Sequence, residues 1–137
     1  MKFKYLEYPR QPSLAFPDKD RTFRPALEVT VKHQARSLKL ICIVDSGADM
    51  CAFPAKVGEF LGLEIKAGKS EKLKGIEGTS SRVYYHELAL EVGGYQFECP
   101  IGFGEGIKFP VLGQDGFFDK FEVTFNYLKN EISLKPF

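Results

Sequence analysis

Apolar and polar side chains alternate through much of the chain, which is the pattern of β-strands with one buried face. The clearest example covers residues 88–92 and 95–101, which Gly93-Gly94 joins into a hairpin. The same alternation over 121–127, followed after a turn by 132–134, predicts a last hairpin. The chain is therefore predicted to be mainly β.

Two earlier strands differ from each other in their pattern. Residues 27–31 alternate and predict a half-buried strand, which a turn at 34–37 joins to the next one. Leu38 to Val44 has only Lys39 as a polar residue, so this segment is predicted to be a strand buried on both sides.

Two short helices are also predicted. The first begins after Pro54, places the apolar residues of 57–61 on one face and stops at Gly62. The second follows a short apolar strand at 109–112, because three phenylalanines recur at helical spacing over 117–121. Strand, glycine-containing loop and short helix thus occur twice, as a weak internal repeat.

Residues 1–25 are predicted to form an N-terminal arm, and residues 26–137 a single domain. Met1 to Tyr8 fits a short edge strand. Four prolines then exclude regular structure from most of the remaining arm. We interpret the arm as an extended wrap and not as a linker to another domain.

Length and charge limit the possible classes of protein. The 137 residues suit one domain with its own core, and a net charge of +1 gives no electrostatic footprint for nucleic acid or an anionic membrane. No apolar run follows the basic start, and none is long enough to span a membrane. Three cysteines in apolar surroundings predict free thiols, so a cytoplasmic protein is expected.

The candidate chemistry centres on Asp45-Ser46-Gly47, which follows the most apolar strand. A carboxylate at the end of a buried strand needs hydrogen bonds, which the Ser hydroxyl and exposed backbone N–H groups supply. On the tripeptide alone a plain β-turn is favoured, since Asp, Ser and Gly are common turn residues. The apolar flanks favour a buried site instead, where a carboxyl group with a shifted pKa would be kept.

A second segment with two readings is Gly75-Ile76-Glu77-Gly78, which resembles the tip of a hairpin. An isoleucine at an exposed tip suggests that it covers something, whereas the alternative is an ordinary turn. The residues alone leave both readings open.

Other chemistries have weaker support. A thiol enzyme would use Cys51 or Cys99 as the nucleophile and His86 as the base, but none has a recognisable cysteine-protease context. No paired-ligand spacing predicts a metal, and no cofactor is expected. The glycine-rich loop at 102–106 lacks the helix and Lys-Ser/Thr that phosphate binding requires.

Three of these segments together resemble the retropepsin-like aspartic proteases, and most closely the single-domain cytoplasmic members from bacteria and archaea. Residues 44–49 look like the active-site segment, 75–78 lie where that family has its flap, and 111–115 look like the partner segment. The resemblance covers about residues 26–135. It implies a single-domain acid-protease β-barrel with its active site at the two-fold axis of a homodimer.

The implied activity is hydrolysis of peptide bonds by two carboxyl groups that share one proton. One carboxylate activates water as a general base, and the other acid polarises the scissile carbonyl. Since the chain has one Asp-Ser-Gly and is too short for a two-lobed enzyme, Asp45 must come from each of two subunits. The implied partners are a peptide or protein substrate and a second copy of the chain.

The resemblance also implies roles for single residues. Ser46 matches the hydroxyl that links the two active-site loops, and Gly47 the residue whose carbonyl accepts from the substrate backbone. Asp49 matches a carboxylate that binds substrate main chain and braces the dimer. The remaining implied substrate-binding positions are Ala48, Phe53 and Val111 near the side-chain pockets, and Gly75, Ile76, Glu77 and Gly78 in the flap.

The sequence departs from the family at two of these places. Gln114 stands where the family often has an arginine that pairs with the carboxylate matching Asp49, and Glu77 puts a charge in the flap tip. A retropepsin-like module that binds peptides with little catalysis is the alternative. The intact Asp45-Ser46-Gly47 argues against it, because a non-catalytic copy has no need of that carboxylate.

Overall fold

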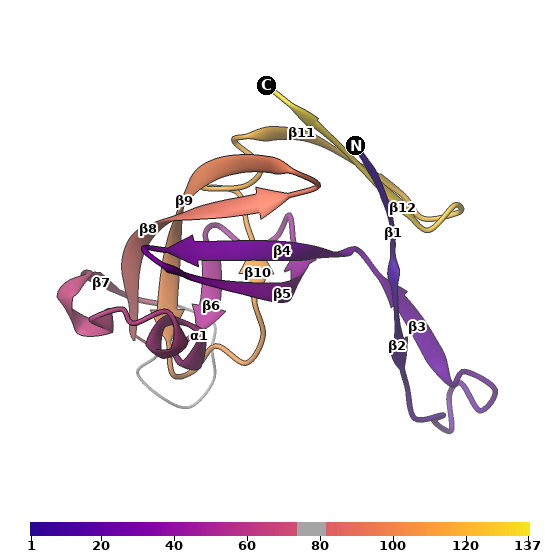
Figure 1. The fold of residues 1–137 in the computed structure, drawn as a ribbon. Coiled ribbons are helices and arrows are strands. Elements are labelled where there is room, and N and C mark those ends of the chain that lie inside the picture. The colour runs from indigo at the N-terminus through magenta and orange to yellow at the C-terminus, as the bar shows by residue number, and fades with distance from the viewer. Residues whose placement is uncertain (74–81) are drawn as a thin grey trace.

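The computed structural model describes residues 1–73 and 82–137 and confirms a mainly β fold (Figure 1). Seven strands form the main sheet in the order β4-β5-β10-β6-β9-β8-β7, and an additional β4–β8 pairing closes it into a barrel. These strands are β4 (Ala26–His33), β5 (Arg36–Val44), β6 (Cys51–Pro54), β7 (Lys69–Lys72), β8 (Arg82–Val92), β9 (Tyr95–Gly104) and β10 (Val111–Leu112).

The two predicted hairpins are both confirmed. Strands β8 and β9 pair antiparallel around Gly93 and Gly94, which have φ values of 55° and 83° and so need glycine. Strands β11 (Phe121–Asn126) and β12 (Glu131–Pro136) form the last hairpin, and β1 (Lys2–Lys4) adds to the outer edge of β12. The resulting three-stranded sheet lies beside the barrel (Figure 1).

The N-terminal arm contains more regular structure than its prolines suggested. Strands β2 (Leu6–Pro9) and β3 (Arg21–Arg24) pair antiparallel and form a hairpin that extends away from the barrel (Figure 1). Pro9 is the last residue of β2, and Pro25 lies between β3 and β4, so neither proline interrupts the ladder. The prediction of a strand within residues 1–8 is confirmed.

Strand β5 is not buried on both sides, so that prediction was wrong. Its buried residues are Cys42 and Val44, whereas Ile41, on the opposite face, is 41% exposed. Only one face of the strand packs against the barrel core, and no other layer of described residues covers the second face. The apolar run therefore reflects a face that this single chain leaves partly open.

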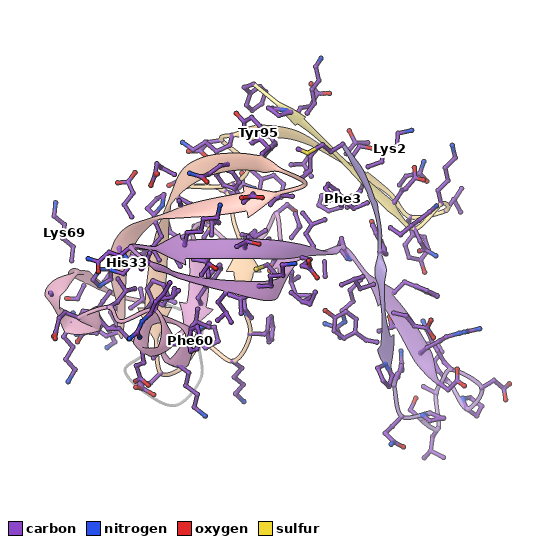
Figure 2. The ribbon with its side chains drawn as sticks, in the orientation of Figure 1. Lys2, Phe3, His33, Phe60, Lys69 and Tyr95 are labelled. Carbon is purple, nitrogen blue, oxygen red and sulfur yellow. The ribbon has the colours of Figure 1, made fainter. Side chains whose placement is uncertain are left out.

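The first predicted helix is confirmed as α1 (Ala55–Phe60), and Gly62 follows it with φ of 78°. One detail differs, because the side chain of Phe60 points into solvent and is 54% exposed (Figure 2). The second predicted helix is wrong: residues 116–120 form turns. The N–H groups of Phe118 and Asp119 donate to the carbonyls of Gly113 and Gln114, and that of Lys120 to Phe117, so these bonds do not have the four-residue spacing of an α-helix. A 3-10 turn, η1 (Ile65–Ala67), was not predicted.

An aromatic cluster links the barrel to the three-stranded sheet. The rings of Phe97, Phe117 and Phe121 lie 5.1 to 6.2 Å apart between centroids. Phe117 and Phe121 are fully buried, which explains why their spacing resembled a helix although the backbone turns between them. This packing fixes the segment after β10, where the candidate site lies.

Candidate active site

Asp45 lies where β5 ends, beside the short strand β10. The two strands run parallel, with Val44 opposite Leu112, and the Asp45 N–H donates to the Leu112 carbonyl oxygen over 3.0 Å. The next residues turn sharply, because the Gly47 N–H donates to Asp45 Oδ1 over 2.8 Å. The Ala48 N–H donates to the Asp45 carbonyl over 3.2 Å, so the backbone and the carboxylate are both held by the loop.

The two segments predicted to belong together are adjacent in the structure. The Gln114 N–H donates to the Ala48 carbonyl over 2.8 Å, and the Asp115 N–H donates to the Asp49 carbonyl over 2.9 Å. Gln114 Nε2 also donates to the Ser46 carbonyl over 2.6 Å. The Gln114 side chain, which stands where the family often has arginine, thus supports the Asp45 loop of its own chain.

The predicted burial of the Asp45 carboxylate is not what the single chain shows. Asp45, Ser46, Gly47 and Asp49 are all exposed, although the strand before them ends in buried Val44. The loop carries them outward from the end of β5, and no described residue of the same chain covers them.

A cavity of about 540 Å³ lies in front of Asp45, and five of the predicted site residues line it. Asp45, Gly47, Ala48, Asp49 and Val111 all line it. Its other lining residues were not predicted: Met50, Ala52, Glu71, Lys72, Leu73, Tyr85, Ile107 and Phe109.

One of these missed residues, Phe109, carried a signal in the sequence, because it belongs to the apolar 109–112 segment that contains the predicted Val111. Phe109 is 53% exposed, and Tyr85 lies on β8 as a partly buried aromatic. Burial raises the pKa of the Tyr85 hydroxyl, and the nearby Glu71 carboxylate adds to that shift. At neutral pH Tyr85 is therefore a neutral hydroxyl that can donate a hydrogen bond into the cavity.

Of the other predicted residues that the structure describes, Ser46 and Phe53 do not line this cavity. Ser46 is exposed in the loop, where its carbonyl accepts from Gln114 Nε2. Phe53 is fully buried and packs edge-on against Phe103, with 6.0 Å between ring centroids, so it belongs to the core. Gly75, Ile76, Glu77 and Gly78 lie outside the described residues.

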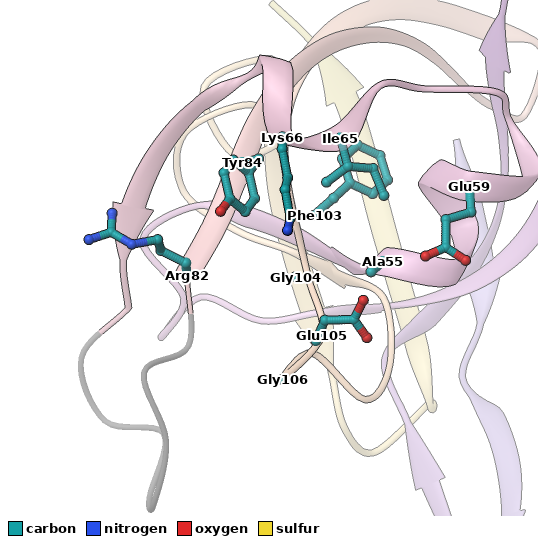
Figure 3. A pocket seen from close by; sticks show the side chains of 10 residues that line it. All are labelled: Ala55, Glu59, Ile65, Lys66, Arg82, Tyr84, Phe103, Gly104, Glu105 and Gly106. Carbon is teal, nitrogen blue, oxygen red and sulfur yellow. The ribbon is translucent and has the colours of Figure 1, made fainter.

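A second cavity of about 480 Å³ lies elsewhere on the barrel, between α1, η1 and the start of β8 (Figure 3). Figure 3 shows Glu59, Lys66, Arg82 and Glu105 around it, with the Phe103 ring at its base. It contains acidic and basic side chains but neither Asp45 nor any other residue of the Asp-Ser-Gly loop. Its two carboxylates, Glu59 and Glu105, come from α1 and from the loop after β9, so this cavity is separate from the Asp45 loop.

The cysteines and His86 do not form a thiol-enzyme site. Cys51 and Cys99 are fully buried, and their mutual hydrogen bond followed by burial raises the pKa of the Cys99 thiol. His86 is instead bonded to the Ile65 carbonyl through Nε2 at 2.8 Å. Cys51 Sγ accepts the Gly113 N–H over 3.3 Å, so this thiol supports the segment behind the Asp45 loop.

No group of three or more His, Cys, Asp or Glu side chains in residues 1–73 and 82–137 is arranged to hold a metal ion. Over the same residues, no helix has the length and apolar character that crossing a membrane requires.

This fold and loop geometry define a retropepsin-like architecture. The chain is similar to a crystal structure of a retropepsin-like aspartic protease from Rickettsia conorii, with a TM-score of 0.61 and 18% sequence identity, over 82% of this chain and 80% of that one. It also matches EIAV protease complexed with the inhibitor HBY-793, with a TM-score of 0.46 and 19% identity, over 66% and 82% of the two chains. No protein-family model matches the sequence, and no curated protein sequence matches it significantly.

The bond from Gln114 to Ser46 predicts a measurable effect on the Asp45 loop. Gln114→Ala removes a 2.6 Å hydrogen bond that fixes this loop, so kcat of any reaction that uses Asp45 is expected to fall about fivefold to tenfold. The unfolding free energy should change by only about 1 kcal/mol, because the side chain is exposed. Steady-state kinetics and thermal melts measure the two effects, and an unchanged kcat would contradict this role for Gln114.

Proposed function

We propose that this protein is an aspartic endopeptidase that works as a homodimer, with one Asp45 from each chain in a single active site. The observation that carries this proposal is the Asp45 loop, in which the carboxylate is held by the Gly47 N–H and opens into the 540 Å³ cavity. The retropepsin-like fold supports the same activity class.

The proposed reaction is hydrolysis of a peptide bond by water held between the two carboxyl groups. The ionised Asp45 removes a proton from water, which attacks the scissile carbonyl carbon, while the protonated Asp45 donates toward the carbonyl oxygen. Collapse of the tetrahedral intermediate breaks the C–N bond, and the amine leaves with a proton from the pair. The Gly47 N–H bond to Oδ1 fixes the orientation of each carboxylate before substrate arrives.

A second chain is needed because one chain presents a single, exposed Asp45. Two carboxyl groups brought together at a two-fold axis cannot both ionise, so one of them holds a proton and the pair acquires acid and base roles. The β11–β12 hairpin provides further apolar surface for this contact, because Phe125 on β11 is 40% exposed and Tyr127 and Leu128 in the turn are 73% and 94% exposed. Such apolar exposure is expected at a face that pairs with another molecule.

The substrate is proposed to be an extended peptide with apolar side chains next to the cleaved bond. Phe109, Val111 and Ile107 supply an apolar wall to the cavity, while Tyr85 offers a hydroxyl. Glu71 and Lys72 add charges of both signs from β7, which suits main-chain and polar contacts farther from the cleaved bond. This arrangement favours hydrophobic over charged residues at the positions that flank the cut.

Inhibitor stoichiometry tests the proposal directly. A statine-containing, pepstatin-type peptide mimics the tetrahedral intermediate, so we expect it to block cleavage of a mixed peptide library by binding between the two Asp45 carboxyls. Titration calorimetry should give one inhibitor per two chains. A monomeric site would give one per chain, and absence of both binding and cleavage would contradict the proposed peptidase activity.

A further inference from the structure

The β2–β3 hairpin, residues 6–24, is fixed at both ends but extends beyond the barrel between them (Figure 1). At its first end, the Tyr5 N–H donates to the Asn130 carbonyl over 2.7 Å, and Tyr5 is buried. At its second end, the Val44 N–H donates to the Pro25 carbonyl over 2.8 Å. Two anchored ends hold the hairpin at a defined place on the molecule.

The hairpin exposes large apolar side chains for which its own chain provides no cover. Leu14 is 105% exposed, Phe16 54% and Phe23 38%, and every residue from 11 to 20 is exposed. The contacts that support it are internal, such as the Arg10 and Lys19 cations over the Phe16 ring at 5.3 and 5.6 Å. A two-stranded hairpin is only marginally stable alone in water, so this one requires a surface to pack against.

The hydrogen bond between Val44 and Pro25 determines where the hairpin leaves the barrel, and so which surface it can contact. Pro25 is hydrogen-bonded to the residue immediately before Asp45, so the hairpin leaves the barrel beside the Asp45 loop. Figure 1 shows it on the side of the barrel where β5 ends. A second Asp45 must approach this same edge in the proposed enzyme, and the chain that carries it is then the nearest large surface to the hairpin.

We propose that the β2–β3 hairpin of each chain packs against the second copy, so that the two hairpins clasp the dimer around the active site. This inference rests on the proposed function, which requires a copy of the chain at the Asp45 edge. The two-fold symmetry places two equivalent hairpins in one dimer, so each substitution in the hairpin acts twice. Leu14, Phe16 and Phe23 are the side chains assigned to this contact.

Sedimentation of matched variants tests the clasp without any measurement of activity. The triple variant Leu14→Ser/Phe16→Ser/Phe23→Ser is expected to raise the dimer dissociation constant about 100-fold, because six apolar side chains leave the interface. Phe60→Ser is the control, since Phe60 on α1 has the same 54% exposure as Phe16 but lies on the barrel. Circular dichroism should show the wild-type fold in both variants.

A photo-cross-link identifies what the hairpin touches. With benzoylphenylalanine in place of Phe16, a mixture of nitrogen-14 and nitrogen-15 chains should give cross-linked peptides that combine the two isotopes. Cross-links within one chain only, or with an added peptide substrate only, would overturn the inference. So would an unchanged dissociation constant in the triple variant.

The outcomes separate this inference from the proposed function. If the dimer depends on the hairpin but wild type cuts no peptide, the peptidase proposal fails and the clasp stands. If cleavage depends on Asp45 but the hairpin substitutions leave the dimer dissociation constant unchanged, the clasp fails and the peptidase proposal stands. If both proposals hold, the triple variant should lose activity because its dimer dissociates. That activity should return at high protein concentration, with KM unchanged.

Discussion

Replacing Asp45 with Asn is expected to lower kcat for peptide cleavage by at least about 1000-fold while the fold and the dimer persist. The Asn side chain keeps an Oδ1 acceptor for the Gly47 N–H, whose bond to Asp45 is 2.8 Å long. It cannot accept a proton from water, so the general base is lost in both chains. Because Asp45 is exposed in the single chain, the variant should fold normally.

Kinetics on a library-derived peptide and sedimentation of the same samples measure this prediction. Glu98→Gln is the matched control, since it also removes one exposed carboxylate but does not line the cavity. A nine-fold excess of Asp45→Asn chains mixed with wild type should leave about a tenth of the wild-type activity, because most wild-type chains then pair with an inactive partner. Full activity in that mixture would show that one chain suffices, and cleavage by the variant alone would show that Asp45 is not the base.

The sequence was most informative where a local pattern has one structural solution. The alternation at 88–101 around Gly93-Gly94 and at 121–134 fixed two hairpins that the structure confirms. Both hairpins are encoded by alternating strands that end on turn residues. The resemblance to the retropepsin-like proteases, and not a local pattern, implied that the Asp45 loop and the 111–115 segment belong together, and backbone bonds from Gln114 and Asp115 join them.

The errors arise where tertiary packing overrides a local pattern. The apolar run of β5 suggested two buried faces, although Ile41 lies on an open one, because an apolar run alone does not show how many faces of a strand the rest of the chain covers. The phenylalanines of 117–121 have helical spacing, but they enter one aromatic cluster through turns that follow Gly116. Phe53 matched a pocket position and is instead a core residue, since the side-chain direction on β6 depends on its pairing with β9.

The N-terminal hairpin shows another limit of sequence reasoning. Residues 6–9 and 21–24 pair across a long, proline-containing connection, and nothing local specifies that register. The cavity residues Tyr85 and Ile107 likewise come from distant segments that only the closed barrel brings to Asp45. The end of the apolar strand before Asp45 was therefore readable from local pattern, whereas the walls of the adjoining cavity depend on long-range strand order.

Gly113→Ala is expected to disrupt the Asp45 loop, because the added methyl group would collide with the backbone of that loop. A Cβ at residue 113 would lie 2.7 Å from the Ala48 carbonyl oxygen and closer still to that of Met50, both backbone atoms of the Asp45 loop. Neither can move without breaking the bonds that Gln114 and Asp115 make to this loop. Gly113→Ala should therefore destabilise the fold by about 3 kcal/mol.

The same methyl group should also displace the Asp45 loop, and a shift of about 1 Å in a catalytic group lowers kcat about 100-fold. Thermal melts and steady-state kinetics measure both effects. Gly94→Ala is the control, because its φ of 83° makes alanine strained while its Cβ meets no atom within 4 Å. That control should lose about 1 kcal/mol of stability and keep its kcat. Wild-type kinetics in Gly113→Ala would mean that the close backbone contact behind Asp45 is not what positions the carboxylate.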